Sequence, residues 1–199
     1  MKIIIIGAGG AVGKTAVQAL SERHDVITAG RSSGDITVDL EDFSSIQTMY
    51  KMVGKVDAVV GAIGHGHFGP VQDMAPEQAM IGIDGKAMAQ INLVLAGIAH
   101  VIDGGSFTLT SGVLNRDPIK GGAAAAAANG AIDGFVAGAA VDMPRGIRIN
   151  AVSPEVLEAS RTKYEGFFRG HNHVSDHAVG EAFSKSVEGC LTGQVFIVE

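Results

Sequence analysis

The first fifteen residues, MKIIIIGAGGAVGKT (residues 1–15), determine the fold that we expect for this chain. The four consecutive isoleucines suit a short strand buried on both faces, as the central strands of parallel sheets are. Gly7, Gly10 and Gly13 follow, and the pattern after them predicts a helix over about 11–22. Glycines at this spacing allow a sharp turn, close approach of a pyrophosphate to the backbone, and tight packing of helix on strand. The stretch therefore predicts a phosphate-binding strand, loop and helix.

The same residues also fit a different phosphate-binding motif, the P-loop, if Ala8 replaces its first glycine. In that interpretation Lys14 would contact terminal phosphates and Thr15 a magnesium ion. In a dinucleotide-binding loop, both are ordinary residues of the first helical turn. A third interpretation, in which the glycines only form a tight turn, has no ligand at all. The rest of the chain has to distinguish among the three.

Composition limits the classes of protein that the chain can represent. Its 199 residues suit one domain, which we expect to span residues 1–199, and the 46% hydrophobic content with 28 glycines suits closely packed α/β layers. A net charge of −6 gives no electrostatic reason to expect nucleic acid or a membrane surface as a partner. The single cysteine, Cys190, excludes an internal disulfide. With no leader or membrane-spanning pattern, we expect a soluble, cytoplasmic protein.

Strand and helix patterns alternate along the remaining chain. After the first strand, we expect strands near 24–29, 35–40, 56–60, 106–111, 146–152 and 193–198, and helices near 43–52, 76–101, 121–143 and 178–189. This alternation predicts an α/β fold: a Rossmann-type, doubly wound parallel sheet of about seven strands with helices on both faces. Ligands of such sheets bind at the carboxyl ends of the strands, near the point where the strand order reverses.

The end of the second strand indicates the type of dinucleotide. An acidic residue at this position binds the ribose 2′-hydroxyl of NAD, whereas an arginine accommodates the 2′-phosphate of NADP. The chain has Arg31 there, followed by Ser32 and Ser33. We therefore expect NADP as the cofactor.

Several motifs, in the same order along the chain, resemble those of the short-chain dehydrogenase/reductase family. They are the glycine loop at 7–13, the pair at 39–40, the segment at 61–64, Ser111 after a strand, the strand ending in Pro154, and the final strand. The resemblance covers nearly the whole chain and implies an NADP-dependent oxidoreductase that acts on a small carbonyl or alcohol. The cofactor contacts that we expect are Gly7, Gly9, Gly10, Ala11, Val12, Gly13, Arg31, Ser32, Ser33, Asp39, Leu40, Gly61, Ala62, Ile63, Gly64, Asn129, Pro154 and Val156.

The residues that carry the family's chemistry are largely replaced. The resemblance places Ala125 where the family has its proton-donating tyrosine, and Asn129 where it has the lysine that lowers the tyrosine pKa and holds the ribose. Asp84 stands where the family has a helix asparagine, and only Ser111 matches. Loss of a positioned general acid typically lowers the rate by about 10²- to 10⁴-fold.

Four other side chains could supply the missing proton, namely Tyr164, His65, His67 and Lys86, although each also suits an ordinary packing or surface role. The candidate catalytic residues are Ser111, Asp84, Asn129 and Tyr164. The spacing of His171, His173 and His177 could indicate a metal site. We expect instead a polar segment over the cleft and no metal.

Two functions are favoured at this point over a third, a P-loop nucleotide-binding protein, because none of the family's other motifs belongs to a P-loop protein. The first is an NADP-dependent oxidoreductase with altered catalysis, and the second is a catalytically silent NADP-binding sensor or subunit. Family members commonly pair through two long helices, here about 77–100 and 121–143, so the resemblance implies a homodimer or homotetramer. A small-molecule substrate is the only other partner that we expect.

Overall fold

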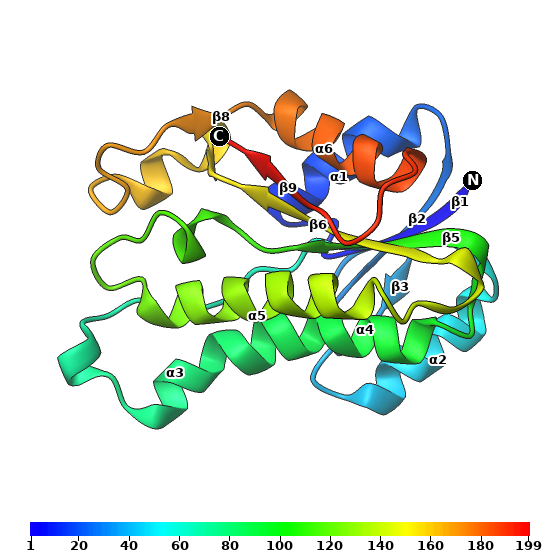
Figure 1. Ribbon diagram of the computed structural model, residues 1–199, viewed down its shortest axis with the longest axis horizontal. Helices are drawn as coiled ribbons and strands as arrows, with labels where there is room; N and C mark the ends of the chain where they lie inside the picture. Colours follow the sequence, from blue (N-terminus) through cyan, green and yellow to red (C-terminus); the bar gives the residue numbers. More distant parts are fainter.

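Seven parallel strands form one sheet in the computed structural model, which describes residues 1–199 (Figure 1). Their order is β3-β2-β1-β4-β5-β6-β9, so the order reverses between β1 and β4. This arrangement confirms the expected Rossmann-type, doubly wound sheet. The strands are β1 (Lys2–Ile6), β2 (Asp25–Gly30), β3 (Ile36–Thr37), β4 (Val56–Gly61), β5 (Val101–Thr110), β6 (Arg148–Pro154) and β9 (Val195–Val198).

Helices cover both faces of this sheet (Figure 1). On one face lie α1 (Ala11–Ser21) and α6 (Asp176–Glu188). On the other lie α2 (Phe43–Val53), α4 (Ala89–Gly97) and α5 (Ala123–Ala139), with α3 (Pro76–Gly82) continuing the line of α4. A π-helical turn, Ile83–Met88, joins α3 to α4. The short strands β7 (Val156–Leu157) and β8 (His173–Val174) form a separate parallel pair.

The isoleucines of β1 divide between two hydrophobic cores. Ile4 and Ile6 pack on the side of α2, α4 and α5, whereas Ile3 and Ile5 pack on the side of α1 and α6. All four side chains are at most 1% exposed. The alternation of β1 side chains between two covered faces explains why this strand has no polar side, as the sequence predicted.

Two elements differ in extent from the sequence prediction. The strand expected over 35–40 is only two residues long, because after Val38 the chain leaves the sheet and the Asp39 amide donates to Ser45 Oγ (3.0 Å). The helix expected over 76–101 ends at Gly97, and β5 begins early, at Val101. Neither change moves the carboxyl ends of the central strands, where the site is expected.

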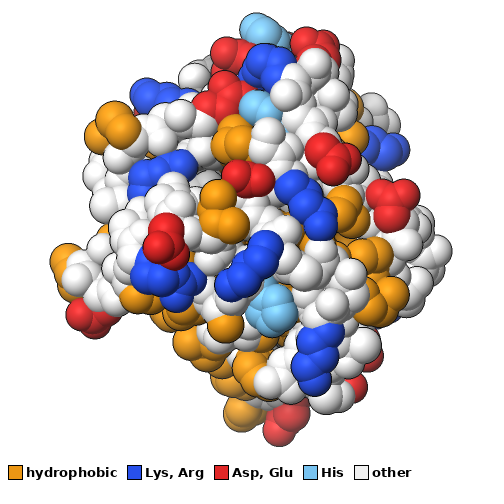
Figure 2. All heavy atoms as spheres, turned by 90° about the vertical axis from the view of Figure 1, so that its right-hand side faces the viewer, with side chains coloured by type: hydrophobic (Ala, Val, Ile, Leu, Met, Phe, Trp, Pro, Cys, Tyr) orange, Lys and Arg blue, Asp and Glu red, His pale blue; other side chains and the backbone are white.

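The surface shown in Figure 2 carries charges of both signs. Figure 2 shows the face at the right of Figure 1, where acidic and basic side chains are interspersed and no large region has one sign of charge. No helix in the structure combines the length and the apolar character needed to cross a membrane.

Candidate active site

The loop between β1 and α1 is held in place by contacts that require glycine. Gly7 has φ +84°, and a Cβ on it would collide with the carbonyl oxygen of Ala62 after the neighbouring strand β4. A Cβ on Gly13 would collide with the carbonyl oxygen of Gly7. The loop is thus fitted tightly between two strand ends and the first turn of α1, as a dinucleotide-binding loop requires.

The first turn of α1 argues against the P-loop interpretation. Thr15 is buried, and its Oγ1 donates to the Val12 carbonyl oxygen (2.8 Å). The hydroxyl is therefore engaged within the helix, and Thr15 does not line the cavity described below. Lys14 is exposed on the outer side of the turn and does not line the cavity described below. Both behave as ordinary helix residues.

A cavity of about 560 Å³ opens at the carboxyl ends of the central strands. Its walls come from the start of α1, the loop after β4, the end of β5, α5, the end of β6, and the segment 158–172 that connects β7 to β8. Ten of the expected site residues line it: Gly10, Ala11, Val12, Ala62, Gly64, Ser111, Asn129, Pro154, Val156 and Tyr164. Gly7, Gly13, Gly61 and Ile63 do not line it; of these, Gly7 and Gly13 shape the loop from behind.

The expected adenosine end lies outside this cavity, on the exposed surface after β2. Arg31 is exposed and forms an ion pair with Glu41 (3.4 Å), an acid that the sequence prediction did not consider. An exposed pair of this kind contributes little, so it leaves the Arg31 guanidinium available to another anion. Ser33 lies beside the glycine loop, because its Oγ is 3.2 Å from the position of a Cβ on Gly9. Also outside the cavity are Ser32, an exposed Asp39 and a half-buried Leu40.

Ser111 is fixed at the end of β5 by a side chain from α4. Gln90 is fully buried, its Oε1 accepts from the Thr110 amide (2.7 Å), and its Nε2 donates to the Thr110 carbonyl (2.9 Å). These two bonds take the place of a neighbouring strand and hold the backbone that carries Ser111. The Ser111 hydroxyl is buried, makes no hydrogen bond and belongs to a residue that lines the cavity. A free hydroxyl held by so rigid a backbone suits contact with a ligand.

Lys86 reaches the same place from the π-helical turn between α3 and α4. Its Nζ donates to Asn129 Oδ1 (2.6 Å) and to the Ser111 carbonyl oxygen (2.7 Å). Burial lowers the pKa of Lys86 to about 8, and the more distant carboxylate of Asp133 opposes this shift. Lys86, Asn129 and Ser111 thus form one polar cluster on the cavity wall, with an ammonium bonded only to neutral acceptors.

The structure corrects the expected role of Asp84. Asp84 is exposed and does not line the cavity, whereas Lys86, two residues further on, does. Gly82, Lys86, Gln90 and Gly97 share the inner side of the helical segment. The four-residue spacing of Gly82, Lys86 and Gln90 is a signal in the sequence from which the inward direction of Lys86 could have been found.

Ala125 lies on the cavity wall, next to the loop after β4. A Cβ on Gly66 would lie 3.6 Å from the Ala125 Cβ, which places the two backbones in close contact. A Cβ on Gly82 would lie 3.2 Å from Ala128 Cβ and 3.3 Å from the Ala124 carbonyl oxygen. The alanine-rich part of α5 therefore packs closely against its own chain.

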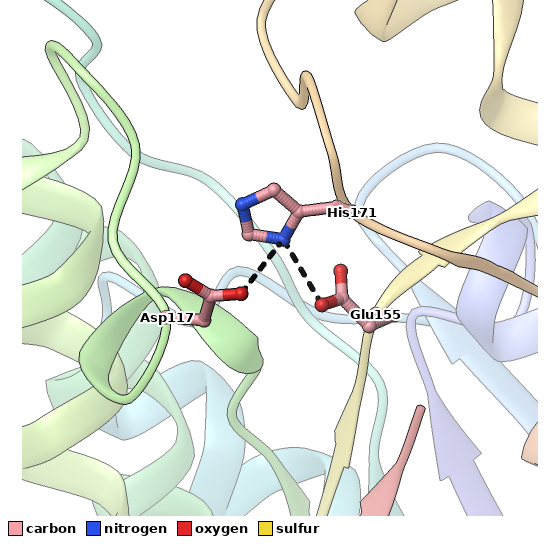
Figure 3. A group of neighbouring side chains, drawn as sticks. All are labelled: Asp117, Glu155 and His171. Atoms are coloured by element: carbon pink, nitrogen blue, oxygen red, sulfur yellow. Dashed lines mark hydrogen bonds and ion pairs between the residues drawn. The ribbon is translucent and has the colours of Figure 1, made fainter.

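Asp117, Glu155 and His171 meet at the base of the segment 158–172 (Figure 3). His171 Nδ1 lies 3.0 Å from Glu155 Oε1 and 3.6 Å from Asp117 Oδ2. The His171 and Glu155 side chains are each 6% exposed, and Glu155 also lines the cavity. His173 and His177 do not belong to this group. The contact between His171 and Glu155 joins the end of segment 158–172 to the residue after β6. The spacing of the histidines along the sequence did not predict this contact.

Comparisons with known proteins agree with this geometry. A family model described as enoyl-(acyl carrier protein) reductase matches residues 1–186. The crystal structure of the protein lin1944 from Listeria innocua is 51% identical, covers 100% of both chains and has a TM-score of 0.98.

Two more distant structures share the fold. A small-chain dehydrogenase in complex with NADPH is 24% identical, with 100% of this chain and 96% of that chain covered and a TM-score of 0.86. A short-chain dehydrogenase/reductase from Serratia marcescens is 18% identical, with 99% and 95% covered and a TM-score of 0.83. No curated protein sequence gave a significant match. The family model, the sheet order and the glycine loop together show that the chain belongs to the short-chain dehydrogenase/reductase family.

Proposed function

We propose that this protein is an NADP(H)-dependent oxidoreductase that interconverts a small carbonyl compound and its alcohol. The observation that carries the proposal is the single cavity that runs from the start of α1 to the cluster of Ser111, Lys86 and Asn129. One end of the cavity is suited to phosphates, because free backbone N–H groups at the start of a helix bind anions. The other end holds hydroxyl, amide and ammonium groups suited to a polar reacting centre.

The chain's residues fit the dinucleotide that the proposal requires. Gly7 and Gly13 hold the loop close to the end of β4 and to the first turn of α1, where a side chain would collide with backbone. Gly10, Ala11 and Val12 at the start of α1 line the cavity. Arg31 is exposed at the end of β2, where the 2′-phosphate of NADP is bound in related folds. The NADPH bound to a protein of the same fold supports the choice of cofactor. When bound, the reduced nicotinamide supplies a hydride to a carbonyl carbon.

In this assignment the residues of the cavity have separate tasks. The Ser111 hydroxyl donates to the carbonyl oxygen of the substrate, and Asn129 holds the polar group next to it. Segment 158–172, fastened by His171 and Glu155, covers the substrate and excludes water. Tyr164 and Phe168 both line the cavity, and their rings pack edge-on with centroids 5.7 Å apart. Together they form an aromatic wall for the substrate.

A second function is favoured by one observation. Ala125 replaces the tyrosine of the family, and its methyl group on the cavity wall can donate no proton. A protein that binds NADP(H) without turnover, as a sensor or subunit, would have this feature. The polar cluster at Lys86 favours the enzyme, because a sensor has no need of a partly desolvated ammonium in its cavity.

Titration with NADPH and NADH, followed by turnover assays, separates these functions. We expect NADPH to bind more tightly than NADH, and NADPH to be oxidised in the presence of at least one compound from a panel of aldehydes, ketones and quinones. Ser111→Ala should then lower kcat. Tight binding with no turnover across the panel would favour the sensor, and binding of ATP with magnesium in place of either dinucleotide would defeat both functions.

We also propose that the protein forms a homo-oligomer through α4 and α5. On α4 Leu95 is 55% exposed and nearby Met88 39% exposed, and on α5 Ala123 and Ala127 are exposed. These small and apolar side chains suit close packing of helices from two copies. Light scattering during size-exclusion chromatography should give a dimer or tetramer, and a monomer at micromolar concentration would refute this part of the proposal.

A further inference from the structure

One charged side chain in the cavity has no charged partner in direct contact. Lys86 Nζ makes two hydrogen bonds, to Asn129 Oδ1 (2.6 Å) and the Ser111 carbonyl (2.7 Å), and both acceptors are neutral. A lysine ammonium has three N–H donors, so one proton is free of these bonds. Lys86 and Ser111 both line the cavity. The third N–H of Lys86 and the unpartnered hydroxyl of Ser111 therefore belong to residues at the same end of the cavity.

The structure around Lys86 is specialised for holding this side chain. It stands in a π-helical turn, Ile83–Met88, a form of helix that is rare and concentrated at functional sites. Asn129 is 4% exposed, and its Nδ2 is 3.1 Å from the position of a Cβ on Gly112, so Gly112 gives the amide room. A partly desolvated lysine would be costly in a protein that did not use it, since burial disfavours its charged form.

The other proton-donor candidates are less well placed. His67 does not line the cavity, and His65 is exposed at its edge, where its ring lies beside Gly85. Tyr164 lines the cavity from the covering segment, where Lys163 Nζ lies 5.1 Å from its ring centroid. Neither His65 nor Tyr164 makes a hydrogen bond to the residues at the end of β5. Lys86 is the candidate that touches both Ser111 and Asn129.

We propose that Lys86 is the catalytic acid and base of this protein, in place of the missing tyrosine, and this inference rests on the proposed function. In the reduction direction, a Lys86 N–H bond breaks and an O–H bond forms at the carbonyl oxygen, while the nicotinamide hydride goes to the carbonyl carbon. Lys86 is left as a neutral amine and regains its proton from water. In the oxidation direction, the neutral amine accepts the hydroxyl proton. Asn129 and the Ser111 carbonyl are the positioning groups that hold the nitrogen.

A lysine suits this chemistry only if its proton is exchanged near neutral pH. Burial lowers the pKa of Lys86 to about 8, so that both protonation states are accessible under ordinary conditions. On α5, Asp133 is the acidic group near Lys86, and Arg116 lies 3.9 Å from Asp133. The other charged or titratable groups nearby are His65, whose ring lies beside Gly85, and Glu155 and Lys163 on the cavity wall. Asp133 is the one whose charge acts on Lys86 to raise its pKa.

Two substitutions separate proton transfer from a purely electrostatic role. Lys86→Gln removes the charge and keeps a side chain that can donate to Asn129, whereas Lys86→Arg keeps the charge but exchanges no proton near neutral pH. We expect both to lower kcat by about 10²- to 10⁴-fold with a smaller change in KM. In the wild-type protein, the reduction rate should fall as pH rises above about 8, and this limb should disappear in both variants. The exposed-surface variant Lys51→Met serves as the control and should keep the limb.

A chemical measurement tests the same lysine without relying on turnover. Competitive acetylation with acetic anhydride, read by mass spectrometry of the peptide that contains Lys86, should show its reactivity rising with a midpoint near pH 8. Lys51, which is exposed on α2, is the internal reference in the same digest.

Each outcome supports or overturns one of the two claims. If neither dinucleotide binds the wild-type protein, the proposed function fails. If NADPH binds but no carbonyl is reduced, the oxidoreductase function and the role of Lys86 both fail while cofactor binding stands. If carbonyls are reduced but Lys86→Arg retains the wild-type rate and pH limb, only the role of Lys86 is refuted. If the variants do not fold, Lys86 reactivity with no midpoint near pH 8 refutes it instead.

Discussion

Replacing Lys86 with methionine should change how stability depends on pH. The substitution removes the ammonium and keeps most of the side-chain volume. In the folded protein, burial lowers the Lys86 pKa from 10.5 to about 8. The unfolded chain therefore holds the proton at pH values where the folded chain has released it, and the wild-type protein gains stability as pH rises through this window.

The size of the effect follows from the shift. At about 1.36 kcal/mol per pKa unit, the full difference amounts to about 3 kcal/mol, of which about 2 kcal/mol is developed between about pH 7 and 9.5. Lys86→Met lacks this gain, so its stability relative to wild type should fall by about 2 kcal/mol over the same range. The two lost hydrogen bonds add an offset that does not depend on pH, so the slope isolates the ammonium.

Urea unfolding of wild type, Lys86→Met and the surface control Lys51→Met at several pH values measures this difference. Groups that titrate in all three proteins cancel in the comparison. The control should follow the wild-type profile. Parallel profiles for wild type and Lys86→Met would refute the reasoning, because they would mean that the ammonium is solvated as well in the folded protein as in the unfolded chain.

Three further substitutions test the site. Gly13→Ala should destabilise the protein by about 2 kcal/mol and abolish dinucleotide binding, because its Cβ would collide with the Gly7 carbonyl oxygen; unfolding curves and NADPH titration check this. Gln90→Leu should cost about 2 to 4 kcal/mol in urea unfolding, because the Thr110 amide and carbonyl lose their buried partners. Arg31→Ala should weaken NADPH binding much more than NADH binding in calorimetric titrations, and equal effects would remove the 2′-phosphate assignment.

The fold could be predicted from the sequence because its signals are local. The isoleucines of β1 and the glycines after them are adjacent along the chain, and the alternation of strands and helices needs only short windows to be recognised. Ser111 and Asn129 were found through the resemblance to the family's motifs, which are also short stretches of sequence. These residues do line the cavity.

The parts that were missed depend on contacts between distant segments. Lys86 and Asn129 are bonded although they stand on different helices, and alignment with the family's asparagine led to the exposed Asp84 instead. A π-helical turn at this place is not evident from side-chain spacing. The contact of His171 with Glu155 likewise joins the covering segment to the end of β6. No short window of sequence contains such pairs.

A nicotinamide dinucleotide should occupy the cavity that Lys86 lines. Acetylation of Lys86 with and without saturating NADPH measures this, with Lys51 in the same digest as the reference. NADPH should slow modification of Lys86 by about tenfold or more and leave Lys51 unchanged. Unaltered modification of Lys86 in protein that has bound NADPH would contradict it, because the dinucleotide would then lie elsewhere.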